Sequence, residues 1–237
     1  MRITLLALLC GLFSIAQTVK INPISTIKTE VTEPSDICLN LLNNKTFFTV
    51  SDDGYLHETD ADGKIIKTAD YRGIDTEAVY AKDDLVYVVQ EFSRKISVFD
   101  ASTLVLKQTL TIPYSGGRNK GYESFTFNAA KNKFVILTEK DPIYLFELDE
   151  KMTVVNEIEL KAIARDISAA TYYNNHLWLL SDDDRTVLKV NPTNYEVVSK
   201  WIVPIINPEG IAFNAEGKLI IVSDDRKMIY YFDNPEN

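Results

Sequence analysis

Cysteine and histidine are both scarce in this chain of 237 residues, since each occurs only twice. Cys10 lies in the apolar stretch that opens the chain, so Cys38 is the one cysteine expected after export and no intrachain disulfide is expected. Cys38 falls inside an apolar strand, and we interpret it as a small core residue. His57 and His176 are far apart, so neither a zinc site nor a Ser-His-Asp triad is indicated.

Long apolar runs are missing after the first residues. Arg2 is followed by an apolar run over residues 3–15, and Ala16 ends this stretch as the small residue before a cleavage point. This pattern is typical of a secretory signal peptide, here residues 1–16. The run is too short to cross a bilayer, and no later segment is long and apolar enough. We therefore expect an exported protein of the periplasm or cell envelope, or a secreted one, without a transmembrane segment.

Basic residues are in deficit. The chain has 25 Lys and Arg against 34 Asp and Glu, a net charge of −9. Removal of Arg2 with the signal peptide makes the mature chain one unit more negative. Such a surface repels nucleic acid and anionic lipid and attracts cations. We expect no nucleic-acid partner.

Helical periodicity is also missing, and a repeated strand pattern takes its place. In each repeat an acidic residue or a serine precedes a short apolar strand, and a second apolar strand then returns and ends in polar or acidic residues. The five copies align on Ser35, Glu77, Glu123, Ser168 and Glu209, with gaps of 42, 46, 45 and 41 residues. A period in this range, with strands only, is typical of the four-stranded blades of a β-propeller.

We therefore predict an all-β fold, a five-bladed β-propeller with four-stranded antiparallel blades, in a single domain over residues 17–237. The fifth repeat lacks its fourth strand after residues 228–232. Residues 18–29 are rich in β-branched side chains and belong to no repeat, so we predict that they form one strand that completes the last blade and closes the ring. The predicted blades span about 33–72, 73–118, 119–163, 164–206, and 207–233 together with 18–29.

The propeller geometry brings acidic residues to one face. The first strand of a blade is the innermost, and the second returns antiparallel, so the start of one and the end of the other lie at the same end of the blade. Glu77, Glu123 and Glu209 should then face one mouth of the central channel, with Ser35 and Ser168 completing the circle. The ends of the second strands supply an outer set of acids, namely Asp52, Asp53, Glu91, Glu139, Asp182, Asp183, Asp224 and Asp225. Three more acids, Glu33, Asp75 and Asp166, stand two residues before the aligned position.

Clustered carboxylates repel one another unless they take up protons, pair with basic side chains or bind a cation. Calcium takes six to eight oxygen ligands, and a ring of Glu77, Glu123 and Glu209 can supply several of them. Two other interpretations stay open. Most outer acids are typical turn and strand-end caps. Arg72 and Arg165 enter near the same face and could pair with the ring, which would remove the need for a metal.

Four phrases resemble the SdiA-regulated family of exported bacterial proteins. They are Glu33-Pro34-Ser35-Asp36-Ile37, Val50-Ser51-Asp52-Asp53-Gly54, Gly121-Tyr122-Glu123-Ser124-Phe125 and Pro208-Glu209-Gly210-Ile211-Ala212-Phe213. The related NHL-type repeats share the Glu-Gly-Ile-Ala phrase. The resemblance covers nearly the whole mature chain, and it implies a five-bladed propeller that binds calcium at one site. Carried over position by position, the matching glutamates are Glu77, Glu123 and Glu209.

The chain departs from the family pattern at two points. Asp36, Ala78 and Ser124 replace the glycine that follows the aligned position, and Ser168 replaces the acid in the fourth repeat. These departures predict a calcium site that is weaker or shifted in this chain. The family has no settled activity that the resemblance could lend.

Three functions fit the sequence. We favour an exported, monomeric, calcium-binding module that holds a protein or small-molecule ligand at the acidic mouth, because no nucleophile is evident. The first alternative is a calcium-dependent lactonase or phosphoesterase, in which the metal polarises a substrate oxygen and Glu123 or Glu209 is a base or a ligand. The second is a metal-free structural interaction domain. The polar loop over residues 115–120 is interpreted as an ordinary connection between blades, with an anion contact as the alternative.

Overall fold

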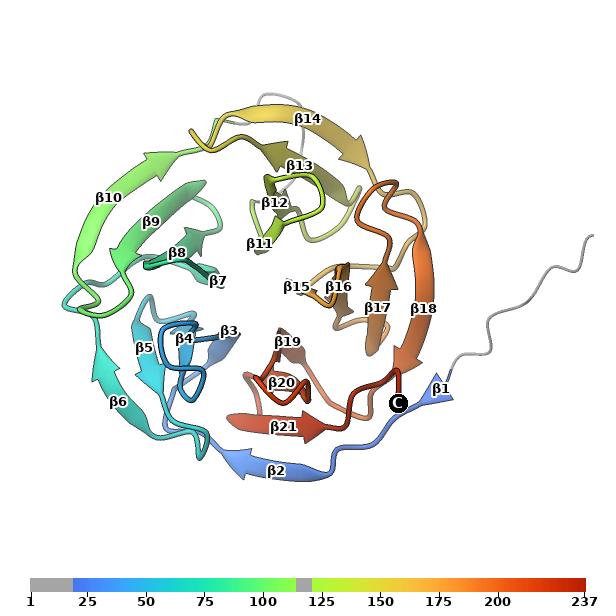
Figure 1. Cartoon of the computed structure of the whole chain (residues 1–237), viewed down its shortest axis with the longest axis horizontal. Helices are drawn as coiled ribbons and strands as arrows, with labels where there is room; N and C mark the ends of the chain where they lie inside the picture. The colour runs from blue at the N-terminus through green and yellow to red at the C-terminus, as the bar shows by residue number, and fades with distance from the viewer. Residues whose placement is uncertain (1–18, 114–120) are drawn as a thin grey trace, which may run out of the picture.

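The computed structural model describes residues 19–113 and 121–237, and in these residues it contains 21 β-strands and no helix (Figure 1). The strands form five sheets arranged around a central axis. The predicted five-bladed propeller of four-stranded antiparallel blades is confirmed. Within these described ranges there is no helix that could span a membrane. The predicted signal peptide and the loop over residues 115–120 lie outside the described residues.

The blades follow one another along the chain, and each runs from its innermost strand outward. Blade one contains β3 (Pro34–Leu39), β4 (Phe47–Ser51), β5 (Leu56–Thr59) and β6 (Ile65–Thr68). Blade two contains β7 (Thr76–Lys82), β8 (Leu85–Gln90), β9 (Lys95–Asp100) and β10 (Leu106–Thr111). Blade three contains β11 (Ser124–Asn128), β12 (Lys133–Leu137), β13 (Tyr144–Leu148) and β14 (Val154–Glu159). Blade four contains β15 (Ala169–Tyr173), β16 (His176–Ser181), β17 (Thr186–Val190) and β18 (Val197–Ile202). Blade five contains β19 (Pro208–Phe213), β20 (Leu219–Ser223), β21 (Met228–Phe232) and, from the other end of the chain, β2 (Ser25–Lys28).

The ring is closed by the N-terminal segment, as predicted, but not by one continuous strand. β2 pairs antiparallel with β21, with Ile27 opposite Ile229. The short strand β1 (Val19–Lys20) instead pairs parallel with β18 of blade four. Figure 1 shows the segment passing outside both blades. Pro23 lies between the two strands, has no N–H to give to a ladder, and marks the point where the chain leaves one blade for the next. The prediction of a single strand over residues 18–29 is therefore corrected to two.

The hydrophobic core is divided into five clusters, one at each junction between neighbouring blades. Alternate residues of each strand point to opposite faces of a sheet, so both faces of every blade are packed against a neighbour. Trp178 and Trp201 stack 5.4 Å apart in blade four, and Phe213 of blade five lies edge-on to Trp178. Cys38 is buried at the junction of blades one and two, as the sequence predicted.

A buried carboxylate joins three blades beside the channel. The Asp36 side chain, on β3, is 1% exposed and accepts hydrogen bonds from the backbone N–H of Val79 on β7 (2.9 Å) and of Ile211 on β19 (3.3 Å). Burial raises the pKa of Asp36 well above its ordinary value, and these backbone donors lower it in part. β3 also approaches β19 so closely that a Cβ at Gly210 would lie 2.7 Å from the Asp36 Cα, which only glycine avoids. Asp36, one of the residues that depart from the family pattern, therefore connects neighbouring blades.

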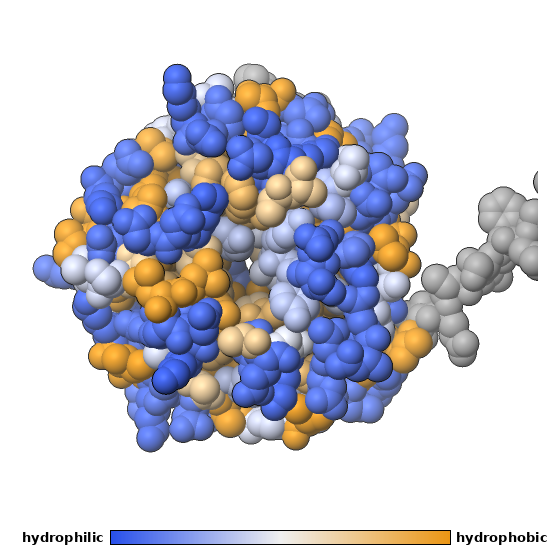
Figure 2. Space-filling view, viewed as in Figure 1, coloured by the Kyte–Doolittle hydropathy of each residue, from blue (hydrophilic) through white to orange (hydrophobic). Residues whose placement is uncertain are grey.

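The central channel opens into cavities of different character at its two ends. The far ends of the innermost strands line a cavity of about 250 Å³, to which Tyr80, Tyr172, Tyr173 and Phe213 contribute. The starts of the same strands line a cavity of about 300 Å³ that is rich in acids. Figure 2 shows one face of the disc with a hollow at its centre. Charge is therefore concentrated at one mouth, and the residues of that mouth form the candidate site.

Candidate metal centre

Three of the five aligned residues occupy β-bulges at the start of the innermost strands. In blade two the pairing shifts by one residue on either side of Glu77, so this residue has no partner on β8. The same shift leaves Ser35 unpaired in β3 and Glu209 unpaired in β19. A bulge takes the extra residue out of the ladder and re-aims its side chain, and bulges are common beside functional sites. The apolar pattern of the sequence carries no signal for these bulges.

A left-handed residue precedes each bulge by two positions. Glu33, Asp75 and Asn207 have φ values of 47°, 57° and 46°. Asp and Asn adopt this conformation more readily than most residues, so they are a sequence signal for the turn. In blades one and two the turn is tied to the end of the second strand, because the N–H of Asp52 donates to the Glu33 carbonyl (3.1 Å) and that of Glu91 to the Asp75 carbonyl (2.9 Å). The carboxylates at the two strand ends are thereby held at the same level of the channel.

The three predicted glutamates line a single cavity at this mouth. Glu77, Glu123 and Glu209 are each half-buried, and all three contribute to the cavity of about 300 Å³. Ser35 also lines it, but the Ser168 hydroxyl instead donates to the Pro208 carbonyl (2.9 Å). The complete lining is Ser35, Asp52, Asp75, Glu77, Glu91, Phe92, Glu123, Glu209 and Asp224. Seven of these nine residues are carboxylic acids, so we name this cavity the acidic mouth.

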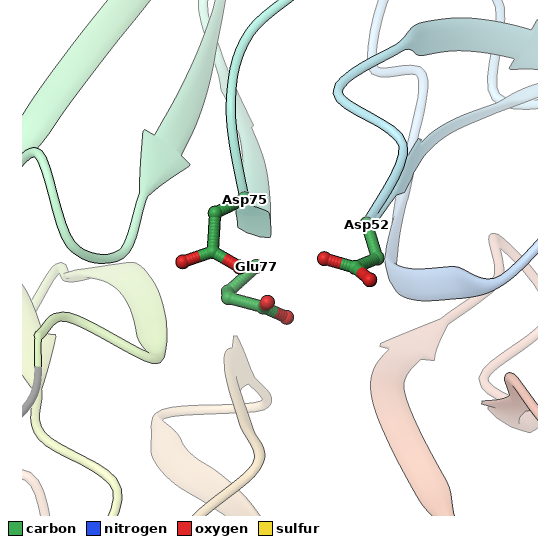
Figure 3. A group of neighbouring side chains, drawn as sticks. All are labelled: Asp52, Asp75 and Glu77. Carbon is green, nitrogen blue, oxygen red and sulfur yellow. The ribbon is translucent and has the colours of Figure 1, made fainter.

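Asp52, Asp75 and Glu77 form the tightest group in the acidic mouth. One carboxylate oxygen of each lies within 4.8 Å of the others, and Figure 3 shows the side chains directed toward one another. Asp75 Oδ2 is buried and has no hydrogen-bond partner. Sequence reasoning placed Asp52 in an outer set and Asp75 beside the aligned position, so it missed this group. The bulge at Glu77 brings the three together.

Burial and mutual repulsion perturb the acids of the mouth. Burial, together with the nearby charge of Asp75, raises the pKa of Glu77 to about 8. Burial and the charge of Asp224 raise the pKa of Glu209 to about 8. Burial and the charge of Glu77 raise the pKa of Glu123 well above its ordinary value. A cavity that holds so many raised carboxyl pKa values favours either protons or a cation.

The two arginines that could have neutralised the ring pair elsewhere. Arg72 donates from Nε to the Asp53 carbonyl (2.8 Å), and its guanidinium lies 3.9 Å from the Asp53 carboxylate. Arg165 pairs with Asp184 at 2.5 Å. Within residues 19–113 and 121–237, no lysine or arginine lines the acidic mouth. No hydrogen bond joins the Glu77, Glu123 or Glu209 carboxylates to this described part of the chain.

A second acidic group lies in blade four and has a structural explanation. Asp166, Asp182 and Asp183 also place carboxylate oxygens within 4.8 Å of one another. Here the Asp166 carboxylate accepts hydrogen bonds from the Ser181 hydroxyl and from the N–H groups of Asp182 and Asp183, both at 3.1 Å. These bonds satisfy the turn after β16, in agreement with the interpretation of most outer acids as caps.

Comparison with protein families identifies the chain. A family model described as SdiA-regulated matches residues 14–233, which is nearly the whole sequence. The chain belongs to the SdiA-regulated family. The resemblance to this family seen in the four sequence phrases is thus confirmed.

A solved structure shares the fold of this SdiA-regulated protein. The crystal structure of Myxococcus xanthus glutaminyl cyclase matches with a TM-score of 0.73 and 13% sequence identity. The match covers 91% of this chain and 97% of that chain. At this identity the similarity shows the common propeller architecture, and the chemistry of the mouth must be argued from the residues present here.

The stability of the metal-free protein is expected to fall as the pH rises from about 5 to about 8. The folded state keeps protons on Glu77 and Glu209 that the unfolded chain, with glutamate pKa values of about 4.3, has already lost, so a rise in pH favours unfolding. We expect a loss of at least about 2 kcal/mol, or at least about 4 °C in Tm. Scanning calorimetry in the presence of a chelator measures it.

Two variants give this measurement its controls. Glu77→Gln removes one of the titrating groups and should make the fall in Tm with pH smaller than in the wild type. Glu157→Gln changes an exposed residue of the outer strand β14 and should leave the pH dependence as it is. If the Tm of the metal-free protein stays constant or rises over this pH range, the pKa values of Glu77 and Glu209 are not raised in the folded state.

Proposed function

We propose that this SdiA-regulated protein is a calcium-binding propeller that uses the acidic mouth to hold a ligand or a protein outside the cytoplasm. The single observation that supports the ion is the convergence of seven carboxylic acids on one cavity that no basic side chain lines within the described residues. The location rests on the signal peptide predicted over residues 1–16.

The donor set suits a hard cation. Calcium binds oxygen ligands at 2.3–2.6 Å, so two oxygens on the same ion lie no more than about 5 Å apart. Asp52, Asp75 and Glu77 meet this limit, since their oxygens lie within 4.8 Å of one another. The unpartnered Asp75 Oδ2 is the kind of buried atom that an ion would satisfy. Glu209 lines the same cavity, and its carboxylate would be a further oxygen ligand.

A calorimetric titration of chelator-treated protein with calcium tests the proposal. At pH 8, where more of the carboxyl groups are ionised, we expect one calcium ion to bind. Glu77→Gln removes an anionic ligand while keeping the size of the side chain, and we expect it to weaken calcium binding at least about tenfold.

Matched controls make the result specific. Glu157→Gln, on the exposed outer strand β14, should bind calcium as the wild type does. Asp166→Asn, in the capped group of blade four, should affect stability but not the calcium affinity. If the wild-type protein takes up no calcium, the metal-free interaction domain becomes the better description.

An enzymatic role is the second candidate, and one observation favours it. Glu77 and Glu209 have pKa values of about 8, close to the value that suits a general acid or base near neutral pH. By its name, the Myxococcus xanthus protein with the same fold is a glutaminyl cyclase. Peptides that begin with glutamine, together with lactones and phosphoesters, therefore make up the substrate panel. Turnover that is lost in Glu209→Gln but kept in Glu157→Gln would support the enzyme.

A further inference from the structure

The two most exposed large apolar side chains of the described residues flank the acidic mouth. Ile74 is 75% exposed and stands just before β7, and Phe92 is 65% exposed and stands just after β8. The start of the first strand and the end of the second lie at the same end of blade two. Exposed apolar side chains bordered by polar ones mark interaction sites. We name Ile74 and Phe92 the apolar pair.

The apolar pair belongs to the same hollow as the carboxylates. Phe92 lines the acidic mouth itself. Ile74 lines an adjoining cavity of about 450 Å³, which shares Asp52 and Asp75 with the mouth and is also lined by Arg72, whose guanidinium lies 3.9 Å from the Asp53 carboxylate. Both cavities fall in the size range of ligand pockets, about 300–1,000 Å³. One ligand can therefore contact the acids and the apolar pair together.

An unused polar group points to a ligand independently of the acids. Ser35 is 6% exposed and lines the acidic mouth, yet its hydroxyl makes no hydrogen bond in the part of the chain that the structure describes. The hydroxyl is not one of the fully buried atoms of the described residues, and it is open to the cavity that Ser35 lines. The Ser35 hydroxyl can supply a donor or an acceptor to a group that enters the cavity.

We propose that the partner of this mouth is a polypeptide segment in which a lysine or arginine stands beside an apolar side chain. The basic group lies over the carboxylates, and the apolar side chain packs on Ile74 and Phe92. Asp52, Asp75 and Asp224 outnumber the two charges of one divalent ion before any glutamate is counted, so the mouth still attracts a basic group when calcium is bound. The net charge of −9 on the whole chain also attracts a basic partner over longer distances. This inference rests on the proposed function, because it takes the acidic mouth as the binding site. It does not depend on which ion the mouth binds.

The inference is tested by measuring how three labelled pentapeptides bind to the full-length protein, using fluorescence anisotropy. The sequences are Ala-Lys-Phe-Lys-Ala, the charge-matched Ala-Lys-Ala-Lys-Ala and the neutral Ala-Gln-Phe-Gln-Ala. We expect the first to bind at least about tenfold more tightly than either of the others, because only it offers both groups. Its affinity should fall as sodium chloride is raised from 50 to 300 mM, because screening weakens charge pairs (about 10 Å Debye length at 0.1 M).

A matched pair of variants locates the binding. The double variant I74S/F92S replaces side chains that are already exposed, so it should fold normally and bind the Lys-Phe-Lys peptide about tenfold less tightly. The control V105S alters a side chain that is 61% exposed in the turn between β9 and β10, at the other end of the blade, and should change nothing. Equal binding by I74S/F92S and V105S, or equal binding of the neutral peptide, would overturn the inference.

Titrations in chelator and in calcium separate this inference from the proposed function. If the peptide binds but calcium does not, the calcium proposal fails and the partner inference stands. If calcium binds but the Lys-Phe-Lys peptide does not bind in either buffer, the partner inference fails and the calcium site stands.

Discussion

Deleting residues 17–29 is expected to lower the Tm of the propeller by about 10–20 °C. The deletion removes the outer strand β2 from blade five and β1 from blade four, and it opens the ring. Besides the ladders of β2 with β21 and of β1 with β18, it abolishes the flanking backbone hydrogen bonds from Ile21 to Ile202 (3.0 Å), from Ile24 to Tyr231 (2.7 Å) and from Thr29 to Lys227 (3.0 Å). At about 1 kcal/mol for each flanking hydrogen bond, with the partial burial of Ile21 and Ile27 added, the loss is at least about 5 kcal/mol.

A peptide added in trans distinguishes loss of ring closure from a general defect. A synthetic peptide of residues 17–31 should bind the truncated protein and restore most of the Tm, because it can pair again with β21. The same peptide with Ile27→Asp should not restore it, since Ile27 packs against the core between blades five and one. Truncated protein that melts at the wild-type temperature would show that the closing strand contributes nothing.

Replacing Asp36 with alanine is expected to destabilise the protein by about 3–5 kcal/mol, or roughly 6–20 °C in Tm. The change leaves the N–H groups of Val79 and Ile211 without the acceptor that joins blades two and five to blade one. Buried donors that lose their partner cost more free energy than the hydrogen bond itself contributes. Asp36→Asn keeps one acceptor oxygen and should cost about half as much. Urea denaturation monitored by tryptophan fluorescence measures both.

The matched control for Asp36 is an acid that makes no such connection. Glu157→Ala alters an exposed residue of β14 and should change the unfolding free energy by less than about 0.5 kcal/mol. If Asp36→Ala proves as stable as Glu157→Ala, then the carboxylate does not hold the blades together, and the close approach of Gly210 alone accounts for the junction.

The number of blades and the face that carries the glutamates could be predicted from the sequence. Strand pairing within a blade is local, so an acidic residue or a serine before a short apolar strand, recurring every 41 to 46 residues, was enough to define the repeat. The antiparallel order of strands then placed Glu77, Glu123 and Glu209 at one end, and the structure brings all three into the acidic mouth.

Local distortions of the backbone could not be predicted in the same way. A bulge adds one residue to a strand without changing its composition, so the register shifts at Glu77 and Glu209 left no mark in the apolar pattern. The left-handed Asp75 was the nearest signal, and it brings this carboxylate to within 4.8 Å of Asp52 and Glu77. The prediction of one strand over residues 18–29 overlooked Pro23, on either side of which the chain joins different blades.

By itself, the sequence determined the architecture of this protein and the sign of the charge at its channel mouth, because both follow from patterns repeated in every blade. Only the tertiary structure decided that Asp36 joins three blades, that Arg72 and Arg165 pair with Asp53 and Asp184, and that Ile74 and Phe92 border the acidic mouth. Each of these contacts depends on one residue in one blade and on neighbours that are distant in the chain. A repeat pattern records what the blades share, and it cannot record where a single side chain differs.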